Sequence, residues 1–479
     1  MTAPRNIKRQ AGRLSTGQIN RRRFVMSALA SGVTLPTAMS LASKAEGATP
    51  RKGGHIRVAT PDPVDFDALL TFAIANTLVE QDGNGHIVGD LARDMQPSAG
   101  GRVWVFDLER DAAFSDGVAL TASYVVESLR PMIDGSQSGV QSIEAMTAHQ
   151  VRFTLANPDF TFPETLAAPE FAILRTDSQG RRIGTGAYRV TERSADRIRL
   201  SRQPEYRKPG RAHFDTVDLT YQPSHLAIQS DFLSGRIDYA AGIAPETLAF
   251  FAHLPDVTQT SFPATRALVV QGTAGSDLAV VKALETLRLG LDRNAFVERA
   301  LLGHGIAGTD TPWPPSGAVL PMQGETLRSL PPRDIPMVSD VAQPWVPHLT
   351  EMAKHLGIAI SEFNHIKGHS ALKASTLTNS EIAKLWEGHP DCVPRGSCET
   401  EAHETVRRAF MQAKAVADAA ERASAFEQAC QTFANHSGVF VPAWANDIAV
   451  HRSNLAHAEA LTPHMPHDAY RLIERWWIA

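Results

Sequence analysis

The chain has 479 residues, 43% of them hydrophobic and 20% charged, and its formal net charge is −4. It is too long for one hydrophobic core, so we expect roughly two or three domains. The mildly acidic balance argues against nucleic acid or anionic lipid as the main partner, and three cysteines exclude a disulfide-dense scaffold.

Residues 20–48 form the first distinctive segment, because three arginines run directly into an apolar stretch that ends in small residues. The apolar part, from 24 to about 39, is shorter than the roughly 20 residues that span a bilayer. A basic start, a short apolar run and a small-residue exit are typical of a signal peptide. The pair Arg21 and Arg22 resembles a twin-arginine signal, which exports folded proteins. The alternative is a basic amphipathic helix on a cytoplasmic protein.

We therefore predict that residues 1–48 are a twin-arginine-type signal peptide and that the rest of the chain works in the periplasm. No cysteine lies near the expected cleavage zone, so we expect no lipid anchor. The segment holds eight of the 47 Lys and Arg residues and one of the 51 Asp and Glu residues. The remainder therefore has 39 basic and 50 acidic residues and a net charge of −11, which strengthens the case against nucleic acid.

The first half of the exported chain mixes strand and helix patterns. Alternation of apolar and polar residues predicts strands at 53–60, 103–108, 149–159, 196–206 and 215–223. Apolar residues at helical spacing predict one helix over 67–82 and another after Thr121, whose hydroxyl is a candidate N-cap.

The second half continues the mixture. We expect helices at 224–236, 278–303, 353–356 and 401–438, and strands at 237–240, 358–364 and 439–450. The Pro-rich stretch 306–347 is predicted to be a long surface connection. Helices and strands mix throughout the chain, so the fold class is α/β.

No pattern of catalytic or metal-binding residues stands out. GxSxG, HExxH and P-loop motifs are absent, and "GTGAY" at 184–188 is not a dinucleotide fingerprint. His365 and His369 would share one face of a helix and could bind a metal, but Gly368 favours a loop with two solvated histidines. We expect no enzyme activity, no cofactor and no metal site.

Two features near residue 390 leave alternatives open. Cys392 and Cys398 could form a local disulfide in an oxidising compartment, or all three cysteines could be unpaired thiols. The stretch "WEGHPDC" at 386–392 combines an aromatic ring with two carboxylates, which suits a loop that binds a cationic or polar small molecule. An ordinary Pro-Asp turn is the alternative.

The order of motifs resembles the extracytoplasmic solute-binding proteins of ABC importers, in the class that carries peptides, opines and nickel complexes. The segment "VWVFDLERDAAFSDGVALTASYVVESL" carries most of this resemblance, because Phe114, Asp116, Gly117 and Thr121 stand where the family signature has them. "GTGAYRV", "SGRIDYA" and "LRLGLDRNAFVERALLGHGIAG" are also similar to family motifs. The segment before "LRLGLDRNAFVERALLGHGIAG" and residues 320–360 depart from the family pattern. The resemblance therefore constrains the identity of the ligand less than any other property.

The resemblance implies a two-lobed periplasmic-binding-protein fold with an additional inserted domain and a ligand cleft between the lobes. Lobe one would combine residues 53–75, 181–265 and 443–479. The inserted domain would cover 76–180, and lobe two would cover 266–442.

The resemblance also implies a function. The protein would capture a short peptide or amino-acid-like compound and deliver it, as a monomer, to an ABC permease complex in the inner membrane. The substrate-binding residues would be Trp386 and Asp391 in lobe two, Trp444 on the returning strand, and Arg266 at the crossing between lobes. The alternatives are a nickel or metal-chelate binding protein of the same fold, a chaperone or sensor subunit, or a secreted enzyme exported by the twin-arginine route.

Overall fold

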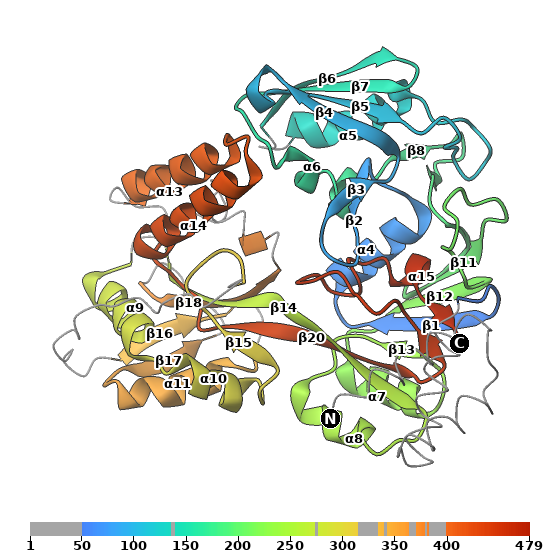
Figure 1. Cartoon of the computed structure of the whole chain (residues 1–479). Coiled ribbons are helices and arrows are strands. Elements are labelled where there is room, and N and C mark those ends of the chain that lie inside the picture. The colour runs from blue at the N-terminus through green and yellow to red at the C-terminus, as the bar shows by residue number, and fades with distance from the viewer. Residues whose placement is uncertain are drawn as a thin grey trace, which may run out of the picture.

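The computed structural model describes residues 50–135, 139–273, 276–314, 334–339, 343–363, 370–378, 381–382 and 399–479. It is a mixed α/β molecule in which one twelve-stranded sheet continues from lobe one into lobe two. The inserted domain lies above lobe one in Figure 1, and lobe two lies to the left of both. We use these three names for the residue ranges given above.

The centre of lobe one is a group of parallel strands. Strand β1 (His55–Thr60) pairs in parallel with β12 (Thr216–Tyr221) on one side and with β13 (Tyr239–Ala240) on the other. The alternation expected for residues 53–60 is confirmed, because Ile56 and Val58 are buried. The sheet extends outward through antiparallel β11 (Arg197–Arg202) and β10 (Tyr188–Arg193). Helices α7 (His225–Leu233), α8 (Leu248–Phe251) and α15 (Leu472–Arg475) also belong to lobe one, as does the pair β21 (Leu455–Ala456) and β22 (Trp477–Ile478).

Helix α4 (Pro63–Ile74) begins directly after β1. Asp62 caps it by accepting a hydrogen bond from the amide of Val64, and Pro63 occupies the first turn, where its missing N–H costs nothing. The predicted helix over 67–82 was wrong at its C-terminal end, because Ala75 is extended and residues 79–81 form β2 (Val79–Gln81). Strand β2 pairs with β3 (Ile87–Gly89) across a turn.

The "GTGAY" motif explains why α4 ends where it does. A Cβ on Gly186 would lie 2.3 Å from the carbonyl carbon of Ile74, and one on Gly184 would lie 2.1 Å from the Ile74 oxygen. Only a residue without a side chain allows this approach of two backbones. The amide of Gly186 donates to the Ile74 carbonyl at 2.9 Å, so the motif terminates the helix and packs it on the sheet.

The inserted domain is an antiparallel sheet covered by one long helix. Its strand order is β4 (Ala92–Ser98), β5 (Val103–Leu108), β7 (Gln150–Leu155) and β6 (Val140–Thr147). Helix α5 (Ala122–Gly135) packs against this sheet, and the domain also contains α6 (Phe162–Thr165) and β8 (Leu174–Thr176). Strand β8 pairs with β9 (Arg182–Gly184), the first strand after the domain. Its core is separate from that of lobe one and is rich in aromatic residues, including Trp104, Phe106, Phe153 and Phe162.

Two long antiparallel strands connect lobe one with lobe two. Strand β14 (Val257–Gly272) leaves lobe one, and β20 (Ala443–Arg452) returns to it. Their register shifts between Phe262 and Arg266, and Ala264 there has a φ of 52°. The sequence predicts strand only from 439 to 450 and misses β14, whose polar and apolar residues do not alternate cleanly over its length.

Lobe two is a mixed sheet with helices on its faces. β18 (Leu372–Thr378) pairs with β14, and β16 (Asp334–Val338) pairs in parallel with β18 and with β17 (Ala359–Phe363). The expected long connection over 306–347 was wrong in part, because β16 lies inside it with Ile335 and Met337 buried. The remaining elements are β15 (Gly305–Ala307), β19 (Val439–Phe440), α9 (Leu278–Gly290), α10 (Arg293–Ala300), α11 (Val346–His355), α13 (Glu399–Lys414) and α14 (Ala419–His436).

Candidate functional site

The carboxyl ends of the parallel strands in lobe one define one side of the candidate site. β1, β12 and β13 all run in the same direction, so Thr60, Tyr221 and Ala240 mark one edge of the sheet. In open α/β sheets, ligands bind outside this edge, where the helix connections turn to opposite sides. The N-terminus of α4 lies there, and the crossing strand β14 passes beside it, since Arg266 contacts Asp62 and Asp65.

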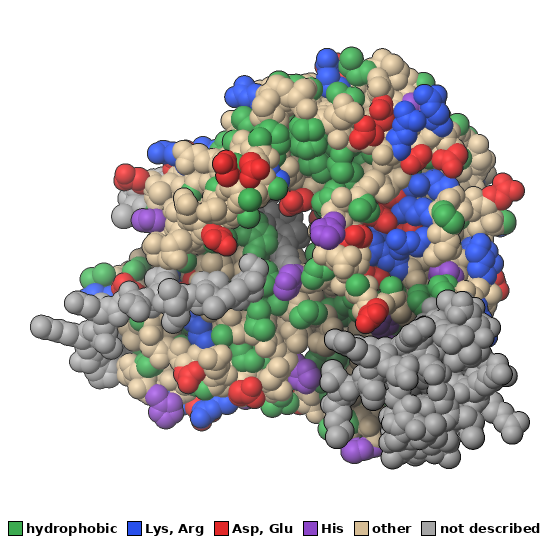
Figure 2. All heavy atoms as spheres, viewed as in Figure 1, with side chains coloured by type: hydrophobic (Ala, Val, Ile, Leu, Met, Phe, Trp, Pro, Cys, Tyr) green, Lys and Arg blue, Asp and Glu red, His purple; other side chains and the backbone are tan. Residues whose placement is uncertain are grey.

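Lobe two presents the corresponding edge of its own sheet. β16, β17 and β18 are parallel to one another, so Val338, Phe363 and Thr378 mark their carboxyl ends. Figure 2 shows the molecular surface hollowed between lobe two and the rest of the molecule. Trp386, Asp391, Cys392 and Cys398, with His365 and His369, lie outside the described residues, as do Arg21 and Arg22. Their assigned roles stay predictions.

Arg266 lies at the crossing from lobe one to lobe two, where its guanidinium meets three carboxylates. Nη2 donates to both oxygens of Asp65 at 2.8 and 2.7 Å, and Nε donates to Asp447 at 3.0 Å. Nη1 lies 3.4 Å from Asp62. The Arg266 side chain is only 13% exposed, so these are charge-assisted contacts in a water-poor region.

His467 completes this group, which we call the Arg266 cluster: Asp62, Asp65, Arg266, Asp447 and His467. Its Nε2 lies 3.2 Å from Asp65, and its Nδ1 lies 2.9 Å from the hydroxyl of Tyr239. The cluster therefore joins the N-terminus of α4, both crossing strands and the segment after β21. It contains three carboxylates, one guanidinium and one imidazole.

The cluster shifts the pKa values of its members in different directions. Burial opposes ionisation of Asp65, but Arg266 and His467 together hold its pKa at about 2. Burial would lower the pKa of Arg266, and Asp447 and Asp65 outweigh this and raise it well above its usual value. Burial and the nearby charge of Asp65 raise the pKa of Asp62. Asp65 and Arg266 thus form a buried ion pair, whereas the carboxyl of Asp62 has a pKa above its usual value.

A left-handed turn holds His467 in place. His467, Asp468, Ala469 and Tyr470 have φ values from 52° to 60°, and the amide of Tyr470 donates to the carbonyl of Pro466 at 2.9 Å. Each non-glycine residue in this conformation costs roughly 1–2 kcal/mol. Such strain persists where the surrounding structure demands it, often at functional sites. The sequence signal for it is weak: His467 and Asp468 are residue types enriched in this conformation, but none of the four residues is glycine or asparagine.

Trp444 lies on β20 and is fully buried. It packs between the crossing strands and helices α13 and α14, with Phe410 and Phe433 in the same cluster. Its indole N–H has no hydrogen-bond partner among the described residues. The structure therefore places Trp444 in a core beside lobe two, and Arg266 in an ion-pair cluster; a role for either in ligand contact stays a prediction.

Sequence reasoning singled out Arg266 and missed the acids that surround it. Asp62 and Asp65 stand in "PDPVDFD", which the sequence presents only as the break after a strand. Asp447 lies in "WANDIAV" and His467 in "HMPHDAY". These four residues come from three distant segments: the N-terminus of α4, strand β20 and the segment after β21. Only the tertiary fold brings them together around Arg266.

Within the described residues, no group of three His, Cys, Asp or Glu side chains is placed to hold a metal ion. In the same part of the chain, no helix combines the length and the apolarity needed to cross a bilayer.

Comparison with known proteins decides the family. Residues 86–325, half of the chain, match the family model described as "Bacterial extracellular solute-binding proteins, family 5 Middle". The chain belongs to this family. Among curated relatives of this solute-binding protein, the nickel-binding periplasmic protein of Escherichia coli (strain K12) is 22% identical over 249 residues. That match covers 47% of this chain and 48% of the relative, so it spans about half of the relative's length.

Two solved structures match most of the chain. One is the periplasmic binding protein AgaA from A. tumefaciens R10 in complex with agropinic acid, with a TM-score of 0.71 and 16% identity over 89% of this chain and 99% of AgaA. The other is DppA from Helicobacter pylori in complex with the peptide STSA, with a TM-score of 0.71 and 16% identity over 89% and 98%. The expected two-lobed α/β fold is confirmed.

Proposed function

We propose that this solute-binding protein captures a small zwitterionic or cationic solute in the periplasm and delivers it to an ABC permease. The ligand would be a short peptide or an amino-acid-like compound. The observation that supports this best is the arrangement of the two lobes. The parallel strands of lobe one and those of lobe two run in opposite directions within the same sheet, so their carboxyl ends point toward each other along the crossing strands. Closure of such lobes around a ligand can bury most of its surface.

The ligand itself would drive the change of state. A solute that contacts both lobes binds the closed form better than the open form, and this difference in affinity shifts the population. The permease would then recognise the closed form. No chemical bond is broken in this scheme, in keeping with relatives that are named for binding.

The charge of the Arg266 cluster favours a ligand with a cationic group. Three carboxylates surround one guanidinium at the lobe-one edge, and Asp62 has the most exposed side chain of the three, at 34%. We propose that Asp391 meets the cationic group from lobe two and that Trp386 and Trp444 supply aromatic contacts. Arg266 would reach a ligand carboxylate through Nη1, which is 3.4 Å from Asp62.

Mass spectrometry of ligand released from freshly purified protein identifies the solute. Calorimetry with that compound should then show that Asp391→Asn weakens binding by about 2–5 kcal/mol, because a cation in the cleft loses its partner. Asp111→Asn, at an exposed position of the inserted domain, is the matched control and should bind normally. Equal affinity of Asp391→Asn and wild type would remove Asp391 as the anchor. Release of no small molecule, with no binding of peptides, would argue against the function itself.

A metal chelate is the second candidate, favoured by the match to the nickel-binding periplasmic protein. Elemental analysis of the purified protein distinguishes it, because a chelate would bring stoichiometric nickel together with an organic ligand. A chaperone or sensor role would instead leave a bound solute without a permease in the neighbouring genes. A secreted enzyme would convert its solute on incubation.

Export by the twin-arginine route is part of the proposal. Replacing Arg21 and Arg22 together with lysine keeps the charge and removes the planar guanidinium groups. Periplasmic protein should fall sharply in cell fractions, and undiminished export would point to the general secretory route.

In the periplasm, Cys392 and Cys398 would close a short loop by a disulfide. Thiol counting on denatured, unreduced protein should then find one free thiol, Cys430, whereas three free thiols would exclude the bridge.

A further inference from the structure

A buried network of charges fixes the inserted domain to lobe one. The ammonium group of Lys208, in lobe one, lies 2.8 Å from Glu80 and 2.7 Å from Asp90, both in the inserted domain. Arg471 of lobe one lies 3.1 Å from Glu80 and 3.3 Å from Asp90. These four side chains are at most 12% exposed. Separating the two parts would leave several buried charges unpaired, so we expect them to move as one body.

Lobe two approaches this body at a second place, far along the chain from the crossing strands. The end of α13 reaches the inserted domain just before α6, and Figure 1 shows these two helices above β14 and β20, on the other side of the space between the lobes. The amide of Phe160 donates a hydrogen bond to the carbonyl oxygen of Lys414 at 2.8 Å. The ammonium group of Lys414 lies 3.3 Å from the Asp159 carboxylate.

The contact between Lys414 and Asp159 differs from an ordinary surface ion pair in its burial and in how firmly the carboxylate is held. The side chains of Lys414 and Asp159 are only 20% and 16% exposed. Asp159 is held in place because the amide and hydroxyl of Thr161 both donate to its Oδ1 at 2.7 Å. The indole N–H of Trp104 donates to its carbonyl at 3.0 Å. The Asp159 carboxylate is thus held in position by contacts within the inserted domain. This lowers the entropic cost of its ion pair with Lys414 of lobe two.

The surrounding charges are complementary across the same boundary. Glu164 follows Asp159 on the inserted domain; burial and the charge of Asp159 raise its pKa, and Lys414 and Arg422 of lobe two oppose this rise. Arg422 also donates to the carbonyls of Val416 and Ala417 at 2.8 Å, which stiffens the turn. Two acids of the inserted domain therefore face two bases of lobe two.

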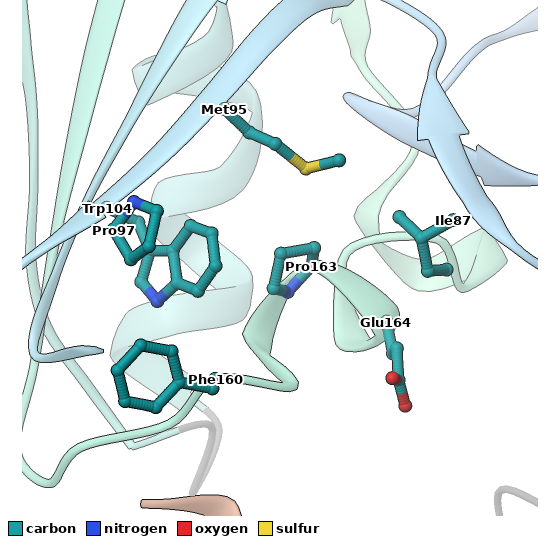
Figure 3. A pocket seen from close by; sticks show the side chains of 7 residues that line it. All are labelled: Ile87, Met95, Pro97, Trp104, Phe160, Pro163 and Glu164. Atoms are coloured by element: carbon teal, nitrogen blue, oxygen red, sulfur yellow. The ribbon is translucent and has the colours of Figure 1, made fainter. Parts of the chain in front are cut away.

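Figure 3 shows the inserted-domain side of this boundary. Phe160, Pro163 and Glu164 line the lower part of an apolar pocket of about 290 Å³, with Trp104 at one side and Met95 at the top of the view. Phe160 is thus part of a packed aromatic surface whose backbone amide points to lobe two. The donor amide belongs to the turn before α6, and the acceptor carbonyl belongs to the last residue of α13.

We propose that Lys414 and the Asp159–Phe160 turn form a latch that holds the two lobes closed on the side away from the crossing strands. The crossing strands β14 and β20, the Lys208 network and the latch then join the three parts of the molecule in a ring around the cleft. A solute enters or leaves when the latch opens. The latch stabilises the closed state even without ligand, so its strength influences the equilibrium between the closed and open forms.

Hydrogen exchange at the Phe160 amide tests the latch directly, because this amide is protected by the Lys414 carbonyl. In ligand-free protein, Lys414→Gln should raise the exchange rate of Phe160 roughly fivefold, the effect expected for losing one partly buried ion pair. The amide of Leu155, which donates to Arg102 inside the inserted domain, should be unchanged. Small-angle X-ray scattering should show a larger radius of gyration for the variant.

Arg407→Gln is the matched control, because Arg407 lies two turns earlier on the same helix and pairs with Glu404 of that helix. It removes the same charge and should leave the exchange at Phe160 unaltered. Unchanged exchange in Lys414→Gln, or equal effects of the two substitutions, would overturn the latch. Because the measurement needs no ligand, its outcome is independent of which solute the protein binds.

Discussion

Arg266 connects the start of lobe two with lobe one through its side chain. It stands on a strand that leaves lobe one, yet its partners are Asp65 on α4 and Asp447 on the returning strand. A buried guanidinium needs such partners, because an unpaired charge in a water-poor region is strongly destabilising. The cluster therefore fixes the point at which the crossing strands leave lobe one, and it positions α4 at the cleft edge.

The first prediction concerns the strength of this ion pair. Asp65→Asn removes the charge that accepts two hydrogen bonds from Arg266, and we expect a loss of about 3 kcal/mol in the free energy of unfolding. Asp67→Asn on the exposed side of the same helix is the control and should change stability by less than about 0.5 kcal/mol. Urea unfolding measures both, and similar midpoints for the two variants would contradict the argument.

The second prediction concerns acid. The folded pKa of Asp65 is about 2, below the ordinary value of 3.8. A lowered carboxyl pKa contributes stability that is present above the unfolded pKa and disappears as pH falls through the folded pKa. We expect about 2 kcal/mol of stability to be lost between about pH 4 and pH 2 through this residue. The difference in unfolding free energy between wild type and Asp65→Asn should shrink over that range, and a constant difference would count against the assignment.

At the level of elements, the turn over residues 467–470 is the least ordinary part of the backbone. Four consecutive residues are left-handed, yet the segment is tied down by His467 to Asp65 and by Asp468 to Arg475 at 2.9 Å. These contacts offset the strain. The turn thus carries His467 into the Arg266 cluster.

The third prediction uses this strain. Ala469 has a φ of 55°, and glycine adopts this conformation without the clash that an L side chain meets. Ala469→Gly should therefore raise the free energy of unfolding by about 0.5–1 kcal/mol, after the extra entropy of glycine in the unfolded chain is subtracted. Ala423→Gly, at an exposed position of the right-handed helix α14, should lower it by about 1 kcal/mol. Opposite signs in thermal unfolding are the expected result, and a loss of stability in both would show that the turn is not strained.

For the whole molecule, local patterns predicted the elements better than their connections. The strand at 103–108 and the two helices within 401–438 follow from periodicity alone. The helix over 67–82 was drawn too long, because the two glycines that stop it lie more than a hundred residues away. The order of motifs identified the family and its fold, since that order survives where individual residues change.

The site was less accessible to sequence reasoning. Arg266 was singled out because the family resemblance places it at the crossing between lobes. Its partner Asp447 follows from the pairing of β14 with β20, and Asp62 and Asp65 follow from the position of α4 beside them, which no local signal encodes. The same holds for Lys208, which sits in an unremarkable "YRKPG" segment and yet contacts Glu80, Asp90 and Glu474. Buried polar networks of this kind join residues by topology, so they appear only when the fold is assembled.

The fourth prediction tests whether this network makes the inserted domain and lobe one a single body. Lys208→Met keeps the length of the side chain and removes the cation from among three nearly buried acids. We expect a loss of about 3–5 kcal/mol in the free energy of unfolding, because the acids are left with fewer compensating charges. The amide of Asp90, which donates to Leu78, should exchange faster with solvent, as the junction opens more often.

Lys282→Met, at an exposed position of α9, removes the same charge and should leave both quantities unaltered. If Lys208→Met behaves like Lys282→Met, apolar contacts alone hold the inserted domain on lobe one. The inserted domain and lobe one would then not have to move together when lobe two closes.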